Sequence, residues 1–150
     1  MQRRELLGTL GLTAAALTAV TGGHVFAAAP DDKDDMHEKC ADACFDCESE
    51  CSAAFHHCFK QVTAGKSAHA KAMHLCVDCA DMCSTAGKLV SRMSPLMVIT
   101  CHACAECCDA CVTECDKLAD GGLKDCSEAL RKCSTACKEM VKAMGGHKGG

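Results

Sequence analysis

The chain has 150 residues, with no tryptophan, no tyrosine and only four phenylalanines. A single domain of this length must therefore build its interior from small side chains, because the large aromatic groups are almost absent. The net charge of −4 is small and gives no footprint for a nucleic acid. Beyond the first 29 residues, no stretch is long and apolar enough to cross a membrane. Neither a nucleic acid nor a membrane is therefore expected as a partner of the mature domain.

Cysteine is present in excess, with 17 residues at the spacing that apolar residues usually have in a helix. From Cys40 to Cys58 the gaps are 4, 3, 4 and 7 residues, and the stripe from Cys101 to Cys115 has gaps of 3, 4, 3 and 4. Such gaps put the sulfur atoms on one face of a helix. Because buried cysteine behaves as a small hydrophobic residue, we expect these thiols to line the core.

Four helices are predicted from the stripes and the breaks between them. We expect helices over about residues 34–62, 67–93, 95–118 and 123–144, with Gly65 capping the first and Pro95 opening the third. The stripes repeat about every 3.5 residues, as in a coiled-coil-like bundle. Short connections make consecutive helices antiparallel neighbours. The predicted fold is therefore all-α, an antiparallel up-down-up-down four-helix bundle with a Cys-lined core.

The N-terminal segment has the features of an export signal. It has a basic start with Arg3 and Arg4, an uncharged middle and small residues near Ala27. The paired arginines resemble a twin-arginine signal; a general secretory signal and a membrane anchor are the alternatives. We therefore expect a signal over residues 1–27, a flexible lead-in over 28–33, the bundle over 34–144, a disordered tail over 145–150 and a periplasmic location.

Seven cysteine pairs have Cys-x-x-x-Cys spacing, which favours binding of a soft metal. Residues four apart on a helix have Cβ atoms roughly 5–6 Å apart. Two metal–thiolate bonds of roughly 2.3 Å span about 4.5 Å in a line. We therefore expect that one helix can hold a two-coordinate ion without distortion, and Cu(I) accepts low coordination by thiolates and thioethers.

Other uses of the thiols remain open. Zinc needs four ligands in a tetrahedron, which two helices could supply. A disulfide-stapled structural or interaction bundle is the usual alternative for an exported Cys-rich chain, although bridges within a helix fit poorly. The cysteines from Cys101 to Cys111 have a ferredoxin-type spacing, but Val112 replaces the proline of that motif and a straight helix cannot surround a cluster. An enzyme is not expected, because no isolated cysteine has a base partner.

With such pairs on all four helices, the chain resembles the bacterial four-helix-bundle copper storage proteins. The resemblance rests on repeated pairs such as Cys40/Cys44 and Cys133/Cys137, and it covers roughly residues 34–144. It implies that core thiolates hold many Cu(I) ions, and that the protein is a tetramer of bundles. The exported branch of that family carries a twin-arginine signal, which agrees with Arg3 and Arg4.

The expected copper ligands are all of the cysteines and four residues at one end of the bundle, here called the Met/His end. The cysteines are Cys40, Cys44, Cys47, Cys51, Cys58, Cys76, Cys79, Cys83, Cys101, Cys104, Cys107, Cys108, Cys111, Cys115, Cys126, Cys133 and Cys137, and the Met/His end consists of Met36, His37, Met97 and Met140. Thioethers bind Cu(I) without deprotonation, so we expect this end to pass Cu(I) to Cys40 and Cys101. Plain packing of the methionines is the alternative.

Some positions are expected to lie outside the metal-binding core. Copper should be sparse beside Ala86, Val90 and Leu130, which replace thiols on their stripes. His56 and His57 are expected to face solvent on the first helix. Three phenylalanines beside the thiols, namely Phe45, Phe55 and Phe59, are expected either to pack within the bundle or to form a subunit interface.

Overall fold

The computed structural model describes residues 32–145, which form four long helices and two single turns of 3-10 helix. The long helices are α1 (Asp32–Thr63), α2 (Ala70–Ser91), α3 (Met97–Lys117) and α4 (Lys124–Gly145), and the short turns are η1 (Ser67–His69) and η2 (Gly121–Leu123). The expected export signal, most of the lead-in and most of the C-terminal tail lie outside the described residues. α1 begins two residues before its predicted start and α4 ends one residue after its predicted end, because residues 32, 33 and 145 are helical.

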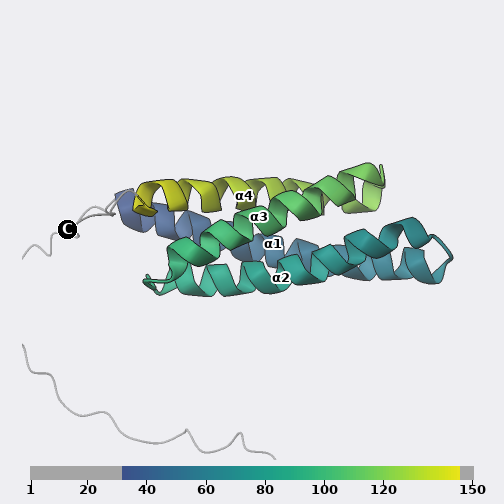
Figure 1. The fold of residues 1–150 in the computed structure, drawn as a ribbon, viewed down its shortest axis with the longest axis horizontal. Coiled ribbons are helices and arrows are strands. Elements are labelled where there is room, and N and C mark those ends of the chain that lie inside the picture. The colour runs from purple at the N-terminus through teal and green to yellow at the C-terminus, as the bar shows by residue number, and fades with distance from the viewer. Residues whose placement is uncertain (1–31, 146–150) are drawn as a thin grey trace, which may run out of the picture.

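The four helices lie lengthwise beside one another (Figure 1). α1 packs against α2 and α4, and α3 packs against the same two helices. The α1–α2 and α3–α4 connections lie together at one end, here called the double-loop end (Figure 1). The Met/His end is the opposite one, where α1 begins and α4 finishes. The predicted antiparallel four-helix bundle is therefore confirmed.

The end of α1 has the glycine cap that the sequence predicts. Gly65 has a φ of +88°, in the left-handed region that glycine adopts without strain. The Gly65 N–H donates to the Val62 carbonyl at 2.9 Å, and the Lys66 N–H donates to the Gln61 carbonyl at 2.9 Å. These bonds satisfy two carbonyls of the last helical turn.

The junction between α2 and α3 differs from the prediction. α2 ends at Ser91, two residues early, because Met93 adopts a φ of +50° and closes the helix as Gly65 closes α1. α3 begins at Met97, because Pro95 belongs to the preceding turn and is not the first helical residue. Ser94 Oγ accepts a hydrogen bond from the Leu96 N–H at 3.3 Å, so this serine stabilises the turn before α3. The predicted start of the second helix at Ser67 is a turn of 3-10 helix instead.

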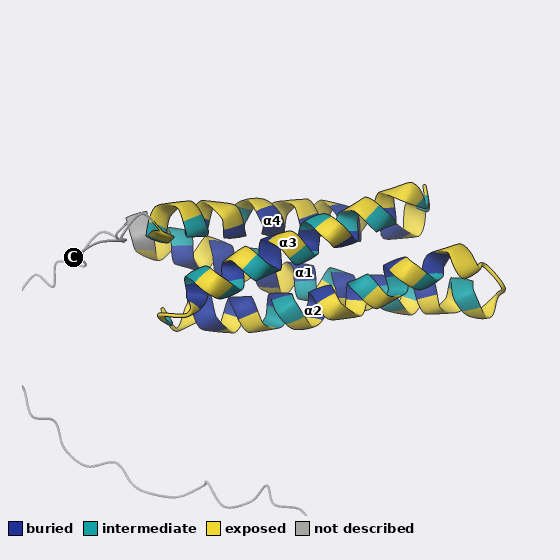
Figure 2. Ribbon diagram, in the orientation of Figure 1, coloured by how far each residue is buried: buried dark blue, intermediate teal, exposed yellow. Residues whose placement is uncertain are grey.

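The core is built from thiols, as predicted. Every cysteine except Cys107 is buried, and the buried stripes face inward along all four helices (Figure 2). The larger side chains that are fully buried beside the thiols are Val90, Leu123, Leu130 and Met140. Burial of this apolar surface is the main stabilising contribution to such a bundle.

Phe45 contributes to the packing of α1 against α2. A Cβ atom at Gly87 would lie 2.8 Å from a ring carbon of Phe45, so the two helices approach closely only because residue 87 is glycine. Phe55 is half-buried, whereas Phe59 is 48% exposed. Among residues 32–145, no helix combines the length and apolar character needed to span a bilayer.

Candidate metal centre

The close sulfur–sulfur contacts mostly join different helices. Cys83 Sγ on α2 lies 3.6 Å from Cys104 Sγ on α3 and 3.8 Å from Cys133 Sγ on α4. Cys44 Sγ on α1 lies 3.7 Å from Cys137 Sγ on α4. Stripes that the sequence assigns to separate helices therefore merge into one column of thiols along the bundle axis.

Two groups of four sulfur atoms are compact enough to surround one metal ion, and each consists of atoms within 4.8 Å of one another. They are Cys44, Cys104, Cys133 and Cys137, and Cys47, Cys83, Cys108 and Cys133. The second group takes one thiol from each of the four helices. Cys133 belongs to both groups, so a thiolate at this position can bridge two ions.

Groups of three sulfur atoms extend the column towards both ends. They include Cys40, Cys101 and Cys137 near the Met/His end, Cys47, Cys51 and Cys79 in the middle, and Cys76, Cys115 and Cys126 near the double-loop end. The first of these has no member on α2, where Ala86 and Val90 are fully buried in place of thiols. This arrangement agrees with the prediction of sparse ligands along the second half of α2.

Two expected ligands lie at the margins of the column. Cys107 is half-buried and has Cys79 as its thiol neighbour. Cys58 is fully buried near Cys115 and Cys126. Burial, followed by electrostatic interactions with Cys115, Asp120 and Cys126, raises the pKa of Cys58 to about 11. This thiol is therefore protonated at neutral pH in the metal-free protein, and a bound metal must displace its proton.

The sulfur spacing bears on the coordination number. Ligands bound at roughly 2.3 Å lie about 3.8 Å apart in a tetrahedron, about 4.0 Å apart in a trigonal site and about 4.6 Å apart in a line. The within-helix pairs Cys47–Cys51 and Cys79–Cys83 both have Sγ atoms 3.9 Å apart. Three- and four-coordinate ions therefore fit the metal-free positions directly. A linear ion on one helix requires the sulfurs to separate by roughly 0.7 Å, contrary to the expectation of a fit without distortion.

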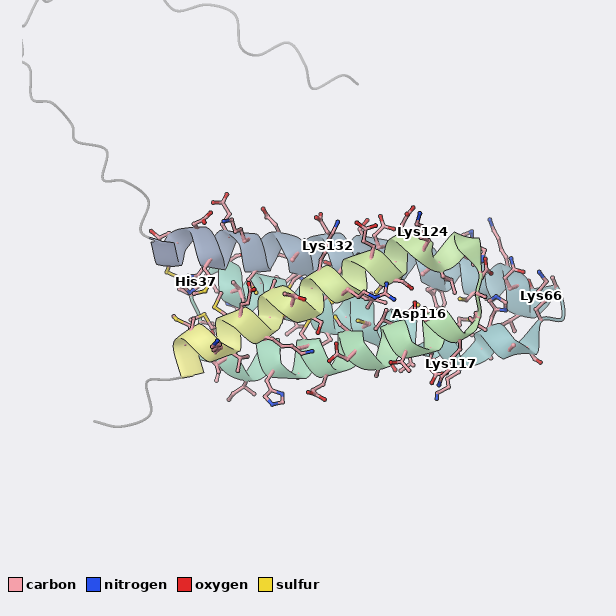
Figure 3. The ribbon with its side chains drawn as sticks, turned by 90° about the horizontal axis from the view of Figure 1, so that it is seen from above. His37, Lys66, Asp116, Lys117, Lys124 and Lys132 are labelled. Atoms are coloured by element: carbon pink, nitrogen blue, oxygen red, sulfur yellow. The ribbon has the colours of Figure 1, made fainter. Side chains whose placement is uncertain are left out.

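At the Met/His end, soft side chains continue the thiol column. Met36 precedes Cys40 by one helical turn, and Met97 precedes Cys101 in the same way. Met36 is half-buried, whereas His37 (7% exposed), Met97 (8%) and Met140 (0%) are buried. Figure 3 shows His37 at this end of the bundle. These side chains fill the end of the core, and Met36 is the most accessible of the four.

One cluster at the double-loop end has no signal in the sequence. His57 Nε2 lies 2.8 Å from Asp120 Oδ2, and His69 Nε2 lies 2.9 Å from the same oxygen. The prediction that His57 faces solvent is wrong, because the α3–α4 connection folds back over it, whereas His56 is exposed as expected. The sequence marks Asp120 only as part of a helix break, and nothing in the spacing relates it to either histidine.

The copper storage protein family (Csp) matches residues 31–142 of the chain. An uncharacterized cysteine-rich protein of Bacillus subtilis, YhjQ, is 34% identical over 106 residues, which cover 69% of this chain and 94% of that protein. The Cu(I)-bound copper storage protein BsCsp3 is 34% identical, with a TM-score of 0.64 over 71% of this chain and 98% of that structure.

A cytosolic copper storage protein from Streptomyces lividans, solved with five coppers, is 27% identical, with a TM-score of 0.68 over 74% of this chain and 96% of that structure. The same protein loaded with 10 copper equivalents has a TM-score of 0.68 at 27% identity, over 78% of this chain and 95% of that one. The match of the family to most of the chain agrees with the buried thiol column. The chain therefore belongs to the copper storage protein family.

Proposed function

We propose that this protein stores several Cu(I) ions in its thiol column and is not an enzyme. The proposal rests on the set of overlapping thiol groups, which contain cysteines from all four helices and extend along the bundle. Cu(I) prefers thiolate and thioether ligands. Relatives with the same fold are described as Cu(I)-bound and as loaded with five or 10 coppers. A buried column suits storage, because it shields the ions from solvent.

The proposed ligands are the seventeen cysteines, with bridging expected where groups overlap. If each ion takes two unshared thiolates, the chain holds about 8 ions; if thiolates bridge, the capacity rises towards about 17. Cys133 is the best candidate for a bridge, because it belongs to two four-sulfur groups. The proposed role of the Met/His end is to deliver Cu(I) to Cys40 and Cys101, with Met36 making the first contact.

A second candidate function is buffering of zinc. Within the two four-sulfur groups, neighbouring sulfur atoms lie 3.7–3.8 Å apart, which fits a tetrahedral Zn²⁺ ion. A zinc buffer would fill these groups first and leave the groups of three empty. Cu(I) uses both kinds of group, so the two candidates differ in the number of ions that the protein binds.

We also propose that the protein is exported by the twin-arginine route. Arg3, Arg4 and the small residues up to Ala27 support this proposal. That route carries folded proteins, so the thiols would be buried before the chain meets an oxidising compartment. Family membership does not decide the compartment, because the Streptomyces lividans relative is described as cytosolic.

A tetramer is proposed for the assembled protein. Three apolar side chains at the start of α3 and in the turn before it support a subunit contact: Met93 and Leu96 are each 56% exposed, and Ile99 is 68% exposed. Clustered exposed apolar residues are typical of interaction surfaces. Light scattering of the purified protein tests the assembly state; a monomer at micromolar concentration would refute this part of the proposal.

Anaerobic titration with Cu(I) in the presence of a competing chelator tests the storage function. We expect more than five Cu(I) ions per chain to bind before the chelator competes, with much weaker retention of zinc. Alkylation of the thiols in denaturant is the matched control and should abolish this capacity. Saturation at one or two copper ions would reject storage. A thiol count far below seventeen in freshly purified protein would instead support the disulfide-stapled alternative.

A further inference from the structure

Three metal-ligating side chains from separate segments converge at the double-loop end. His57 belongs to α1, His69 to η1, and Asp120 to the α3–α4 connection, and these segments meet at the same end of the bundle (Figure 1). Both Nε2 atoms lie within 2.9 Å of Asp120 Oδ2. The imidazole rings are inclined at 63° with centroids 6.3 Å apart, so they approach the carboxylate from different directions.

The backbone holds the Asp120 carboxylate in place. Its other oxygen, Oδ1, accepts a hydrogen bond from the Gly122 N–H at 2.9 Å. A Cβ atom at Gly122 would lie 2.4 Å from Cε1 of His57, so a side chain here would displace the ring. The side chains are shielded and still reachable, since their exposed fractions are 28% for His57, 10% for His69 and 20% for Asp120.

We propose that His57, His69 and Asp120 form a binding site for a divalent transition-metal ion, separate from the thiol column. Two imidazole nitrogens and one carboxylate oxygen are the ligands that borderline divalent ions prefer, whereas Cu(I) prefers sulfur. In the metal-free protein the histidine N–H groups donate to Asp120. In the bound form the ion takes the place of the Nε2 protons and is held by both Nε2 atoms and Oδ2.

The ligand types, together with the two nitrogen–oxygen distances, favour one type of ion. Ligands bound at roughly 2.0–2.1 Å lie about 2.9 Å apart when the bonds are at right angles and about 3.3 Å apart in a tetrahedron. The two nitrogen–oxygen distances of 2.8 and 2.9 Å fit the right-angled arrangement. Square-planar or tetragonal sites with nitrogen and oxygen ligands are typical of Cu(II). We therefore assign Cu(II) to this site in preference to tetrahedral zinc, with water completing the coordination.

The test uses the full chain already loaded with Cu(I), because empty thiols would bind or reduce added Cu(II). One equivalent of Cu(II) is added, weakly bound metal is removed by gel filtration, and the electron paramagnetic resonance spectrum is recorded. We expect one retained Cu(II) per chain, with a tetragonal spectrum coupled to two nitrogen nuclei. Because Cu(I) gives no such signal, the spectrum reports on the divalent site and not on the ions in the thiol column.

Variants assign the signal to its ligands. His57→Gln, His69→Gln and Asp120→Asn should each weaken Cu(II) binding by at least about tenfold, since even changes next to metal ligands cost 10–100-fold. His56→Gln and His74→Gln are the matched controls, because both histidines are exposed, and these variants should bind as the parent does. Circular dichroism and unchanged Cu(I) content verify that each variant is folded.

Two outcomes would overturn the proposal. The first is a parent protein that retains no Cu(II), or that gives a spectrum with fewer than two coupled nitrogens. The second is an unchanged spectrum and affinity in the folded variants of His57, His69 and Asp120, which would place the ion on other residues. The spectrum of the parent protein tests the proposed site even where a variant does not fold.

Discussion

Replacing Cys133 with serine is expected to remove more copper from the store than replacing Cys107. Cys133 Sγ lies 3.7 Å from Cys104 Sγ, 3.8 Å from Cys44 Sγ and 3.8 Å from Cys83 Sγ. A thiolate in this position can bridge two ions, so Cys133→Ser should lower the capacity by about two Cu(I) per chain. Cys107 lies at the margin beside Cys79, and Cys107→Ser should cost about one ion at most.

The same substitution has a calculable effect on the metal-free fold. Cys133 is fully buried, so a serine hydroxyl there lacks the water that would hydrogen-bond to it. Burial of a poorly satisfied hydroxyl costs about 1–3 kcal/mol, which lowers the melting temperature of a small domain by roughly 4 °C or more. Cys133→Ala is the matched control, because it removes the ligand without introducing a polar group. It should lose the same copper with a smaller loss of stability.

The assay is anaerobic Cu(I) titration against bathocuproine disulfonate, with thermal unfolding of each metal-free variant followed by circular dichroism. Equal capacity losses for Cys133→Ser and Cys107→Ser, in folded proteins, would refute the argument that overlapping thiol groups share ligands. A larger loss for Cys107→Ser would refute it more strongly.

Four further outcomes are expected. The metal-free protein in reductant should be helical, because the buried thiols and aliphatic side chains form a core without metal; a random-coil circular dichroism spectrum would contradict this. Conversion of Arg3 and Arg4 to lysine should leave the precursor in the cytoplasm, as cell fractionation would show, and unchanged export would remove the twin-arginine proposal. Changing the four residues of the Met/His end to leucine should slow copper transfer to a chelator while leaving capacity nearly intact; unaltered stopped-flow rates would assign these residues to packing. The hydrogen bond to His57, then those to Gly122 and His69, lower the pKa of Asp120. The Asp120 carboxylate therefore stabilises the fold above about pH 4, the ordinary pKa of an aspartate, and this contribution is lost as the pH falls below that. Acid titrations of unfolding for the parent and Asp120→Asn should therefore diverge above that pH and converge below it.

The helices and their inward faces were predictable because the thiol stripes repeat at helical spacing and the breaks contain glycine or proline. Gly65 illustrates this, since its left-handed conformation is one that glycine adopts readily. The end of α2 was not predictable in the same way. Met93 adopts the left-handed conformation that normally favours glycine, so the sequence contains no sign that the helix stops two residues before it.

The grouping of thiols across helices could not be predicted from spacing within one helix. Cys83 and Cys133 are 50 residues apart in the chain, and their contact depends on the rotation and axial shift of α2 against α4. The pairing of Asp120 with His57 was inaccessible for the same reason. It depends on how the α3–α4 connection folds back over α1, which local pattern does not determine.

The measurement that tests the central claim most directly is X-ray absorption at the copper edge, on protein loaded with Cu(I) to its measured capacity. If the ions are held by the thiol column, the edge should be that of Cu(I), and the first shell should contain sulfur almost exclusively, at roughly the 2.3 Å typical of metal–thiolate bonds. Short copper–copper distances should accompany it, because thiolates such as that of Cys133 bridge adjacent ions. A first shell dominated by nitrogen or oxygen, or copper that is held as Cu(II), would contradict the account.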